Sequence, residues 1–317
     1  GPDGEVVREA AQILVESSTS VGTVTVDATG FGTDQECPAA VISVIEGASE
    51  VAPQTKLRLS AEQSIPVNGT IGEYDWSVEQ PIGSADFFMP NSKSSVVEIT
   101  ANTAGIYLVK LKVRDQGTWS CEPAERRILV IPDEAIHVHL IWENAKDPDP
   151  SDMIGTDMDL HFVHLDNAIG DPQGDDAYPP KPAMQDGINE GYFHPDWDTY
   201  FGYTTQDWGK AGVKEDDPSL DRDDIDGAGP ENLNLNAPEQ GVTYRIGVHY
   251  FSSQGIDADA FFPTPVEFGS STPIVRIFLF GEMVAELVGC PMSNDDMWDV
   301  GTFIGSTGDP SLYQCNA

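Results

Sequence analysis

The segment AGIYLVKLKVRD (residues 104–115) places an apolar side chain at every second position from Tyr107 onward. This period of two is the pattern of a β-strand with one buried face. The segment TKLRLSA (residues 55–61) shows the same alternation. Between Cys37 and Pro132, segments of this kind follow one another with turn residues about every ten positions, as in a β-sandwich. The sequence therefore predicts an all-β fold for this region.

This region resembles the polycystic-kidney-disease-type (PKD) immunoglobulin-like domain of bacterial extracellular proteins. The resemblance rests on V-x-P-x-T-x-L-x-L-x-A (residues 51–61), Y-x-W-S-V (74–78) and A-G-x-Y-x-V-x-L-x-V-x-D (104–115). It implies an immunoglobulin-like sandwich in which Trp76 is the core tryptophan and Tyr107 follows the turn glycine. The loop after Asp115 departs from the usual short Asp-Gly turn of the family.

Alternating apolar segments return after Ala135. They read DLHFVH (residues 159–164), TYRIGVHYF (243–251), PIVRIFLF (273–280) and MVAELVG (283–289). Long polar loops separate them, and such loops inside a compact domain are usually functional or held by ions. The pattern favours a second β-sandwich of jelly-roll type.

We expect three regions along the chain. Residues 1–35 are predicted to hold a short helix over Glu5–Glu16 and a strand, as the remnant of an upstream region. Residues 36–132 form the PKD-type domain, and residues 133–317 form the jelly-roll-like sandwich. The opening Gly1-Pro2 resembles a protease-cleavage scar, so we expect that the native N-terminus was removed.

The chain is strongly acidic. It has 53 acidic and 16 basic residues, for a formal net charge of −37. Such a charge repels nucleic acid and anionic membrane surfaces, so we expect neither nucleic-acid binding nor direct membrane insertion. Between Glu143 and Glu231 there are 23 acidic residues and 5 basic ones. This clustering favours a bound counter-ion, although a solvation role for a uniformly acidic surface stays open.

Ca²⁺ is the cofactor that the acidic segments predict. The loop DDPSLDRDDIDGAGPEN (residues 216–232) offers many carboxylates together with turn glycines. Calcium takes six to eight oxygen ligands from loops of this kind. It is not an EF-hand, because aligning Gly227 with the turn glycine of that motif would put Arg222 and Leu233 at its first and last ligand positions. The alternative is a solvated acidic turn without an ion.

A second acidic segment, in which Asp157 and Asp159 share one side of a strand, adds the best single pair of ligands, because adjacent carboxylates repel unless a cation lies between them. The predicted metal ligands are Asp157, Asp159, Asp221, Asp223, Asp224, Asp226 and Glu231.

The second half also resembles a recurring bacterial surface β-sandwich domain, similar to pre-peptidase C-terminal-like domains. The matching motifs are D-x-D-L-H-F (residues 157–162), L-D-x-D-D-x-D-G-x-G-P-E-N (220–232) and Y-R-I-G-V-H-Y-F (244–251). The resemblance implies a β-sandwich in a bacterial secreted or cell-surface protein. The insertion at 167–191 departs from the shorter members of that family.

Four cysteines are spread along the chain without a CxxC pair. Their wide spacing disfavours a zinc or thioredoxin-like site and suits an oxidising compartment. Sequence order favours the disulfides Cys37–Cys121 and Cys290–Cys315, although four cysteines permit three pairings and free buried thiols remain an alternative.

An aromatic-rich segment spans residues 192–208. Exposed rings beside carboxylates are typical of sugar sites, so Trp197, Tyr200, Tyr203 and Trp208 are speculative ligand-binding residues. A small satellite core under the long loops is the equal alternative.

His137 and His139 have a spacing that suits zinc or copper, but such histidines are more often exposed strand residues. No nucleophile elbow, HExxH motif, phosphate loop or cysteine-nucleophile pattern occurs in the chain. We therefore expect no enzyme and no catalytic residue. A hydrolase that uses paired carboxylates is the less favoured possibility.

The sequence thus predicts a calcium-stabilised binding or adhesion module with a surface glycan, cell wall or protein as its ligand. The alternative is a purely structural spacer of a surface assembly.

Overall fold

The computed structural model describes residues 37–84, 86–147, 155–169, 191–225, 227–252, 254–257, 264–305 and 310–312. Nearly all regular structure in these ranges is β, which confirms the predicted fold class. The helix predicted over Glu5–Glu16 and the strand after it lie outside the described residues. Residues 37–317 form one compact unit.

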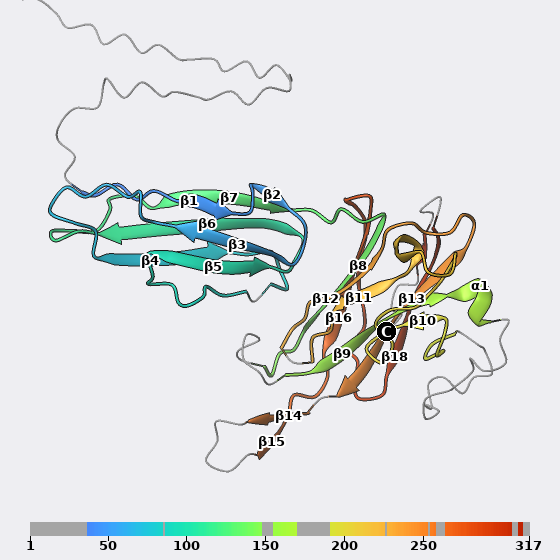
Figure 1. The fold of residues 1–317 in the computed structure, drawn as a ribbon. Helices are drawn as coiled ribbons and strands as arrows, with labels where there is room; N and C mark the ends of the chain where they lie inside the picture. Colours follow the sequence, from blue (N-terminus) through green and yellow to red (C-terminus); the bar gives the residue numbers. More distant parts are fainter. Residues whose placement is uncertain are drawn as a thin grey trace, which may run out of the picture. The chain divides into compact units, whose positions relative to one another are not determined.

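The first sandwich consists of two sheets, shown in blue to green in Figure 1. The three-stranded sheet has the order β1 (Ser43–Glu46), β3 (Thr55–Ser60), β5 (Val96–Ala101). The four-stranded sheet has the order β2 (Glu50–Val51), β7 (Ala124–Val130), β6 (Gly105–Arg114), β4 (Glu73–Glu79). All pairs are antiparallel except β2 with β7.

The core of the first sandwich follows the alternation of its strands. Leu57 and Leu59 of β3 are fully buried, as is Tyr107 of β6. Trp76 of β4 is buried, and its Nε1 donates a hydrogen bond of 2.9 Å to the carbonyl of Ser94. Trp76 and Tyr107 therefore take the core positions that the sequence predicts.

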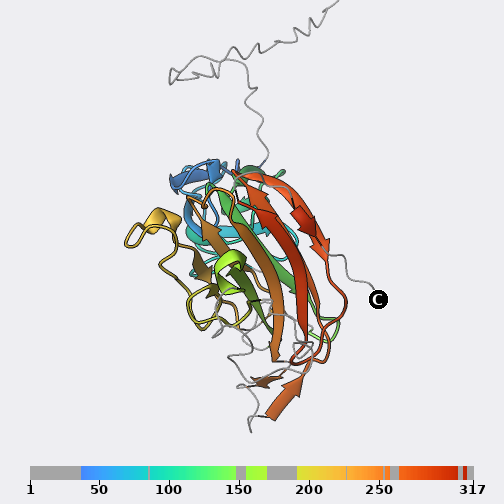
Figure 2. The ribbon, with the colours of Figure 1, turned by 90° about the vertical axis from the view of Figure 1, so that its right-hand side faces the viewer.

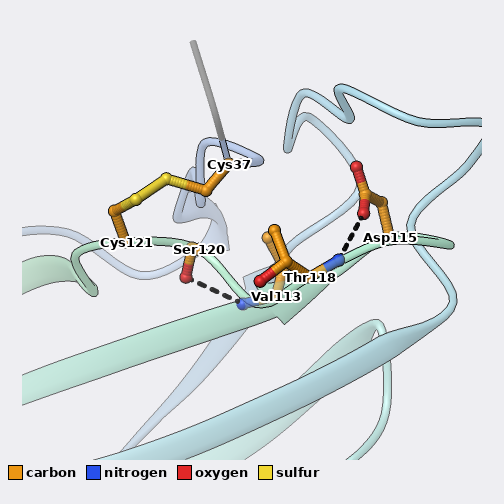
Figure 3. The surroundings of a disulfide bond; sticks show 6 residues. All are labelled: Cys37, Val113, Asp115, Thr118, Ser120 and Cys121. Atoms are coloured by element: carbon orange, nitrogen blue, oxygen red, sulfur yellow. Dashed lines mark hydrogen bonds between the residues drawn. A yellow bond between two sulfur atoms is a disulfide. The ribbon is translucent and has the colours of Figure 1, made fainter.

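A disulfide and the hydrogen bonds of an aspartate hold together the loops at one end of the first sandwich (Figure 3). Cys37 and Cys121 form the predicted disulfide, with Cα atoms 5.7 Å apart. Nearby, Asp115 accepts hydrogen bonds from four backbone N–H groups, those of residues 67, 68, 117 and 118. These bonds lower the pKa of Asp115 to about 2. The carboxylate thus holds the loop that departs from the PKD pattern.

Cys290 is also in a disulfide, and no described cysteine is free. Its predicted partner, Cys315, lies outside the described residues.

The second sandwich consists of two five-stranded antiparallel sheets. One has the order β10 (Asp198–Thr199), β9 (Asp157–His164), β13 (Thr243–Ser252), β18 (Met297–Ile304), β19 (Pro310–Leu312). The other has the order β11 (Ser219–Arg222), β12 (Glu231–Leu235), β8 (Ile136–Glu143), β16 (Thr272–Leu279), β17 (Glu282–Val288). Figure 1 shows β8, β12 and β16 in one layer and β9, β13 and β18 in the other.

Smaller elements complete the second half of the chain. They are β14 (Gln254–Asp257) paired with β15 (Thr264–Glu267), a 3-10 turn (Lys214–Asp216), and helix α1 (Leu165–Ala168), which is the short green helix in Figure 2. None of the helices among the described residues is long and apolar enough to cross a membrane.

Apolar side chains from both sheets fill the space between them. Phe162 of β9 stacks on Tyr244 of β13, with ring centroids 5.1 Å apart. Leu233 of β12 and Val138 of β8 face them from the other sheet in the same core cluster. The burial of one full face on each sheet is what makes this pair of sheets stable.

The disulfide generates a testable prediction. Replacing Cys37 and Cys121 by serine removes a cross-link between residues 84 positions apart. We expect the free energy of unfolding of the first sandwich to fall by about 2–4 kcal/mol, because the unfolded chain regains loop entropy. Urea denaturation followed by tryptophan fluorescence measures this, and reduction of the unaltered protein, which also breaks the disulfide of Cys290, is the comparison. An unchanged midpoint in both would contradict it.

Candidate metal centre

Three carboxylates meet at one edge of the second sandwich. Asp159, Asp223 and Glu231 each offer a ligand oxygen, and these three oxygens all lie within 4.8 Å of one another. Asp159 comes from β9 and Glu231 from β12, so the cluster joins the two sheets. Asp223 lies in the loop that follows β11. Two oxygens on opposite sides of one calcium ion, each about 2.3–2.6 Å from it, are separated by a similar distance.

Asp159 is placed by the alternation of β9. Its neighbours Met158 and Leu160 point into the core, so its side chain takes the outer face of the sheet. The carboxylate is nevertheless only 2 % exposed, and Oδ2 lies 3.3 Å from Nδ1 of His249 on β13. Burial raises the pKa of Asp159 to about 7.

Glu231 is fully buried. Its Oε2 accepts a hydrogen bond of 2.6 Å from the backbone N–H of Leu160, which ties β12 to β9 across the two sheets. Its Oε1 is also buried and makes no hydrogen bond to a described residue. Burial raises the pKa of Glu231 well above its ordinary value, and the negative charge of Asp159 adds to the shift. A buried carboxyl oxygen of this kind is satisfied either by a proton or by a cation.

The turn before Glu231 requires glycine. Gly229 has a φ of +85°, and a Cβ at this position would lie 2.9 Å from the carbonyl oxygen of Leu140. A side chain at position 229 would therefore force the turn away from β8 and move Glu231 with it.

Asp223 gives the cluster its contact with solvent. It is exposed, whereas Asp159 and Glu231 are buried. The site thus combines two fixed carboxylates on strands with a third on an open loop. This arrangement allows an ion to enter from the loop side and to keep water among its ligands.

Three other predicted ligands among the described residues are not part of this cluster. Asp221 accepts a hydrogen bond from the side-chain amide of Asn234 on the outer face of the sheet. Asp224 forms an ion pair with Arg222 at 3.5 Å. Asp157 shares a side of β9 with Asp159 but is not among the three converging carboxylates, and Asp226 lies outside the described residues. Of the six predicted ligands among the described residues, the structure brings three together.

A buried polar network stands behind the cluster. Nδ1 of His161 lies 2.6 Å from Oδ2 of Asp198, and both side chains are fully buried. The ring of His161 stacks on Tyr200 and meets the edge of Phe193 at 4.5 Å between centroids. This enclosure leaves His161 as a packed neighbour of Asp159.

Burial argues against the predicted sugar platform. Trp208 is 1 % exposed and Tyr200 is 5 % exposed, so neither ring presents a face to solvent. Trp197 is half-buried, and Tyr203 is the one of the four that is exposed. Tyr200 belongs to a satellite cluster on the outer face of β9, and Trp208 belongs to the main core. The satellite-core alternative is the one that the structure favours.

The predicted exposure of His137 and His139 is wrong. They are 1 % and 0 % exposed, because the outer face of β8 is covered. Their rings are stacked with centroids 6.3 Å apart, and among the described residues no group of three converging ligand residues includes either of them.

Comparisons with known proteins do not assign this chain to a family. No protein-family model matches the chain, and neither does any curated protein. Among solved structures, the crystal structure of the chicken CNTN1 FN1–FN3 domains covers 82 % of this chain and 99 % of its own, at 9 % identity and a TM-score of 0.22. A TM-score this low carries no argument about function. Fold and site together define an all-β, disulfide-bonded protein with a carboxylate cluster between two sheets.

The burial of two carboxyls predicts how the metal-free protein responds to pH. Asp159 and Glu231 have pKa values above those of the unfolded chain, which are about 4. The folded state therefore holds more protons than the unfolded state between about pH 4 and 7, so its stability falls as pH rises through that window. In chelator at pH 8, Glu231→Gln should raise the free energy of unfolding by about 2 kcal/mol, because it removes a buried charge and can keep the bond to Leu160.

Thermal unfolding at several pH values measures this effect. Asp224→Asn is the matched control, because Asp224 is paired with Arg222 outside the cluster, and it should leave the pH dependence unchanged. A destabilised Glu231→Gln protein in chelator would contradict the prediction.

Proposed function

We propose that this chain is a calcium-stabilised binding or adhesion module of a secreted or cell-surface protein. The observation that carries the proposal is the convergence of Asp159, Asp223 and Glu231 within 4.8 Å, two of them buried. Calcium would be held by these carboxylates together with water and backbone carbonyls of the loop.

The donor set favours calcium over other ions. It contains only carboxylate oxygen, whereas structural zinc prefers cysteine and histidine ligands. Magnesium requires a near-ideal octahedral site at about 2.0–2.1 Å and is usually held by one or two carboxylates with several waters. Three carboxylates, one of them on an open loop, suit the larger and less directional ion.

The ion would act as a cross-link. It would join β9 of one sheet to β12 of the other and hold the loop around Asp223 against both. Ordering a loop before a partner arrives lowers the entropy cost of binding. In this way the metal would preorganise the surface at this edge of the sandwich for a glycan, cell-wall or protein ligand.

Two further features support this assignment. The Cys37–Cys121 disulfide fits an oxidising, extracytoplasmic compartment. Asp159 and Glu231 are only 2 % and 0 % exposed, so a substrate would have little access to their carboxylates. For this reason we propose no enzymatic activity. A structural spacer is the second candidate, favoured by the burial of Tyr200 and Trp208.

Calorimetric titration of the chelator-treated protein with calcium tests the metal site. We expect saturable binding that Asp159→Asn combined with Glu231→Gln abolishes and Asp224→Asn preserves. Calcium at 100 times its dissociation constant should stabilise the folded protein by about 2.7 kcal/mol, because only the folded state assembles the site. Equal heats from the unaltered protein and the double variant would contradict the assignment.

The binding role is tested separately, with a glycan array and a pulldown on bacterial cell walls in calcium and in chelator. We expect retention in calcium that weakens at least tenfold in chelator and in the double variant. Retention that is absent in both conditions would favour the spacer.

A further inference from the structure

Two histidines lie buried on the outer face of the sheet that contains β8. His137 and His139 both point away from the sandwich core, which takes Ile136 and Val138 of the same strand. Their imidazole rings are nearly parallel, with an interplanar angle of 19°. Neither ring has access to solvent, so any hydrogen bond or charge stabilisation of the rings must come from neighbouring protein groups.

Few hydrogen-bond partners surround these rings. Nδ1 of His137 lies 2.5 Å from Oδ1 of Asn234, its cross-strand neighbour on β12. Nε2 of His137 and both ring nitrogens of His139 are buried and have no hydrogen-bond partner among the described residues. A protonated imidazole carries two N–H donors, and most of these would have no acceptor here.

Charged groups face the two rings from the neighbouring strands. Asp221 on β11 and Asp133, which precedes β8, favour the protonated form of His137. Arg276, directly opposite His139 on β16, disfavours a proton there, even though it is paired with Glu286 of β17 at 2.8 Å. At His137 burial outweighs the two carboxylates and lowers the pKa to about 4. At His139 burial lowers the pKa well below its ordinary value, and His137 and Arg276 add to that shift.

The same sheet face contacts the first sandwich. The side-chain amide of Asn232, opposite His139, donates to the carbonyl of Asn102 at 3.2 Å. Arg276 donates to the carbonyl of Ile82 at 3.1 Å. Both acceptors are backbone carbonyls that do not titrate, and the donors Asn232 and Arg276 lie directly opposite His139 on the two neighbouring strands.

We propose that His137 and His139 form an acid-sensitive lock, which holds the outer sheet face against the first sandwich while both rings are neutral and releases it when they take up protons. The lock is independent of the proposed metal site.

The direction of the effect follows from proton linkage. In the open or unfolded state, both histidines have an ordinary pKa of about 6.5. In the closed state their pKa values are lower, so stability is full above about pH 6.5 and is lost as pH falls toward 4. The equilibrium constant for opening should rise up to about tenfold per pH unit for each histidine.

The test compares the full chain with a variant that cannot titrate here. His137→Gln keeps a donor for Asn234, and His139→Phe fills the space of a ring that makes no described hydrogen bond. Phe278→Leu is the control, because the ring of Phe278 packs against that of His137, with centroids 5.6 Å apart, but carries no charge. All variants keep the three clustered carboxylates, so loss of metal at low pH affects them equally.

Hydrogen exchange between pH 6.5 and 4.5, corrected for intrinsic rates, follows residues 80–84, 100–105 and 136–140. We expect these segments to lose protection together in the unaltered protein and in the control. In the double variant the loss should be at least tenfold smaller. Equal loss in all three proteins would overturn the proposal.

If the double variant does not fold, a second measurement on the unaltered protein tests the proposal. The Cε1–H resonances of His137 and His139 in the unaltered protein should not titrate above pH 5. Titration of either near pH 6.5 in the folded state would overturn the proposal as well.

Discussion

Two carboxylates of one cluster are buried in the second sandwich, where each needs a proton or a cation to neutralise its charge. Asp159 and Glu231 have little solvent to stabilise their charges, and Asp223 adds a third negative group beside them. Without a cation the site is expected to retain protons, as the raised pKa values of Asp159 and Glu231 indicate. With a divalent ion, the same groups would cross-link the two sheets. The proposed function depends on which of these states prevails.

The site also explains why polar residues interrupt otherwise apolar strands. Glu231 points inward beside Leu233. Its Oε2 accepts a hydrogen bond from the N–H of Leu160, whereas its Oε1 has no hydrogen-bond partner among the described residues. On the opposite side of the same sheet, His137 and His139 are buried beside Asn232 and Arg276, which donate hydrogen bonds to the first sandwich. Both faces of this sheet therefore carry buried ionisable groups.

Strand positions were largely predictable from alternation, because segments such as residues 104–115 bury every second side chain. β12 and β18 were not predicted. In β12 all five residues are buried, including two asparagines, so the sequence shows no apolar alternation. Periodicity tells which residues share a face but not whether another element covers that face. For this reason the burial of His137 and Trp208 could not be read from the sequence. Asp159, Asp223 and Glu231 were among the predicted ligands because the acidic segments are short and dense, but their convergence required the fold.

The most direct test of the central claim is a crystal structure of the protein grown in millimolar calcium, with anomalous scattering recorded to locate the ion. A bound calcium ion would give one anomalous peak between β9 and β12, about 2.3–2.6 Å from carboxylate oxygens of Asp159, Asp223 and Glu231. Well-ordered density for these three side chains with only water between them would contradict it.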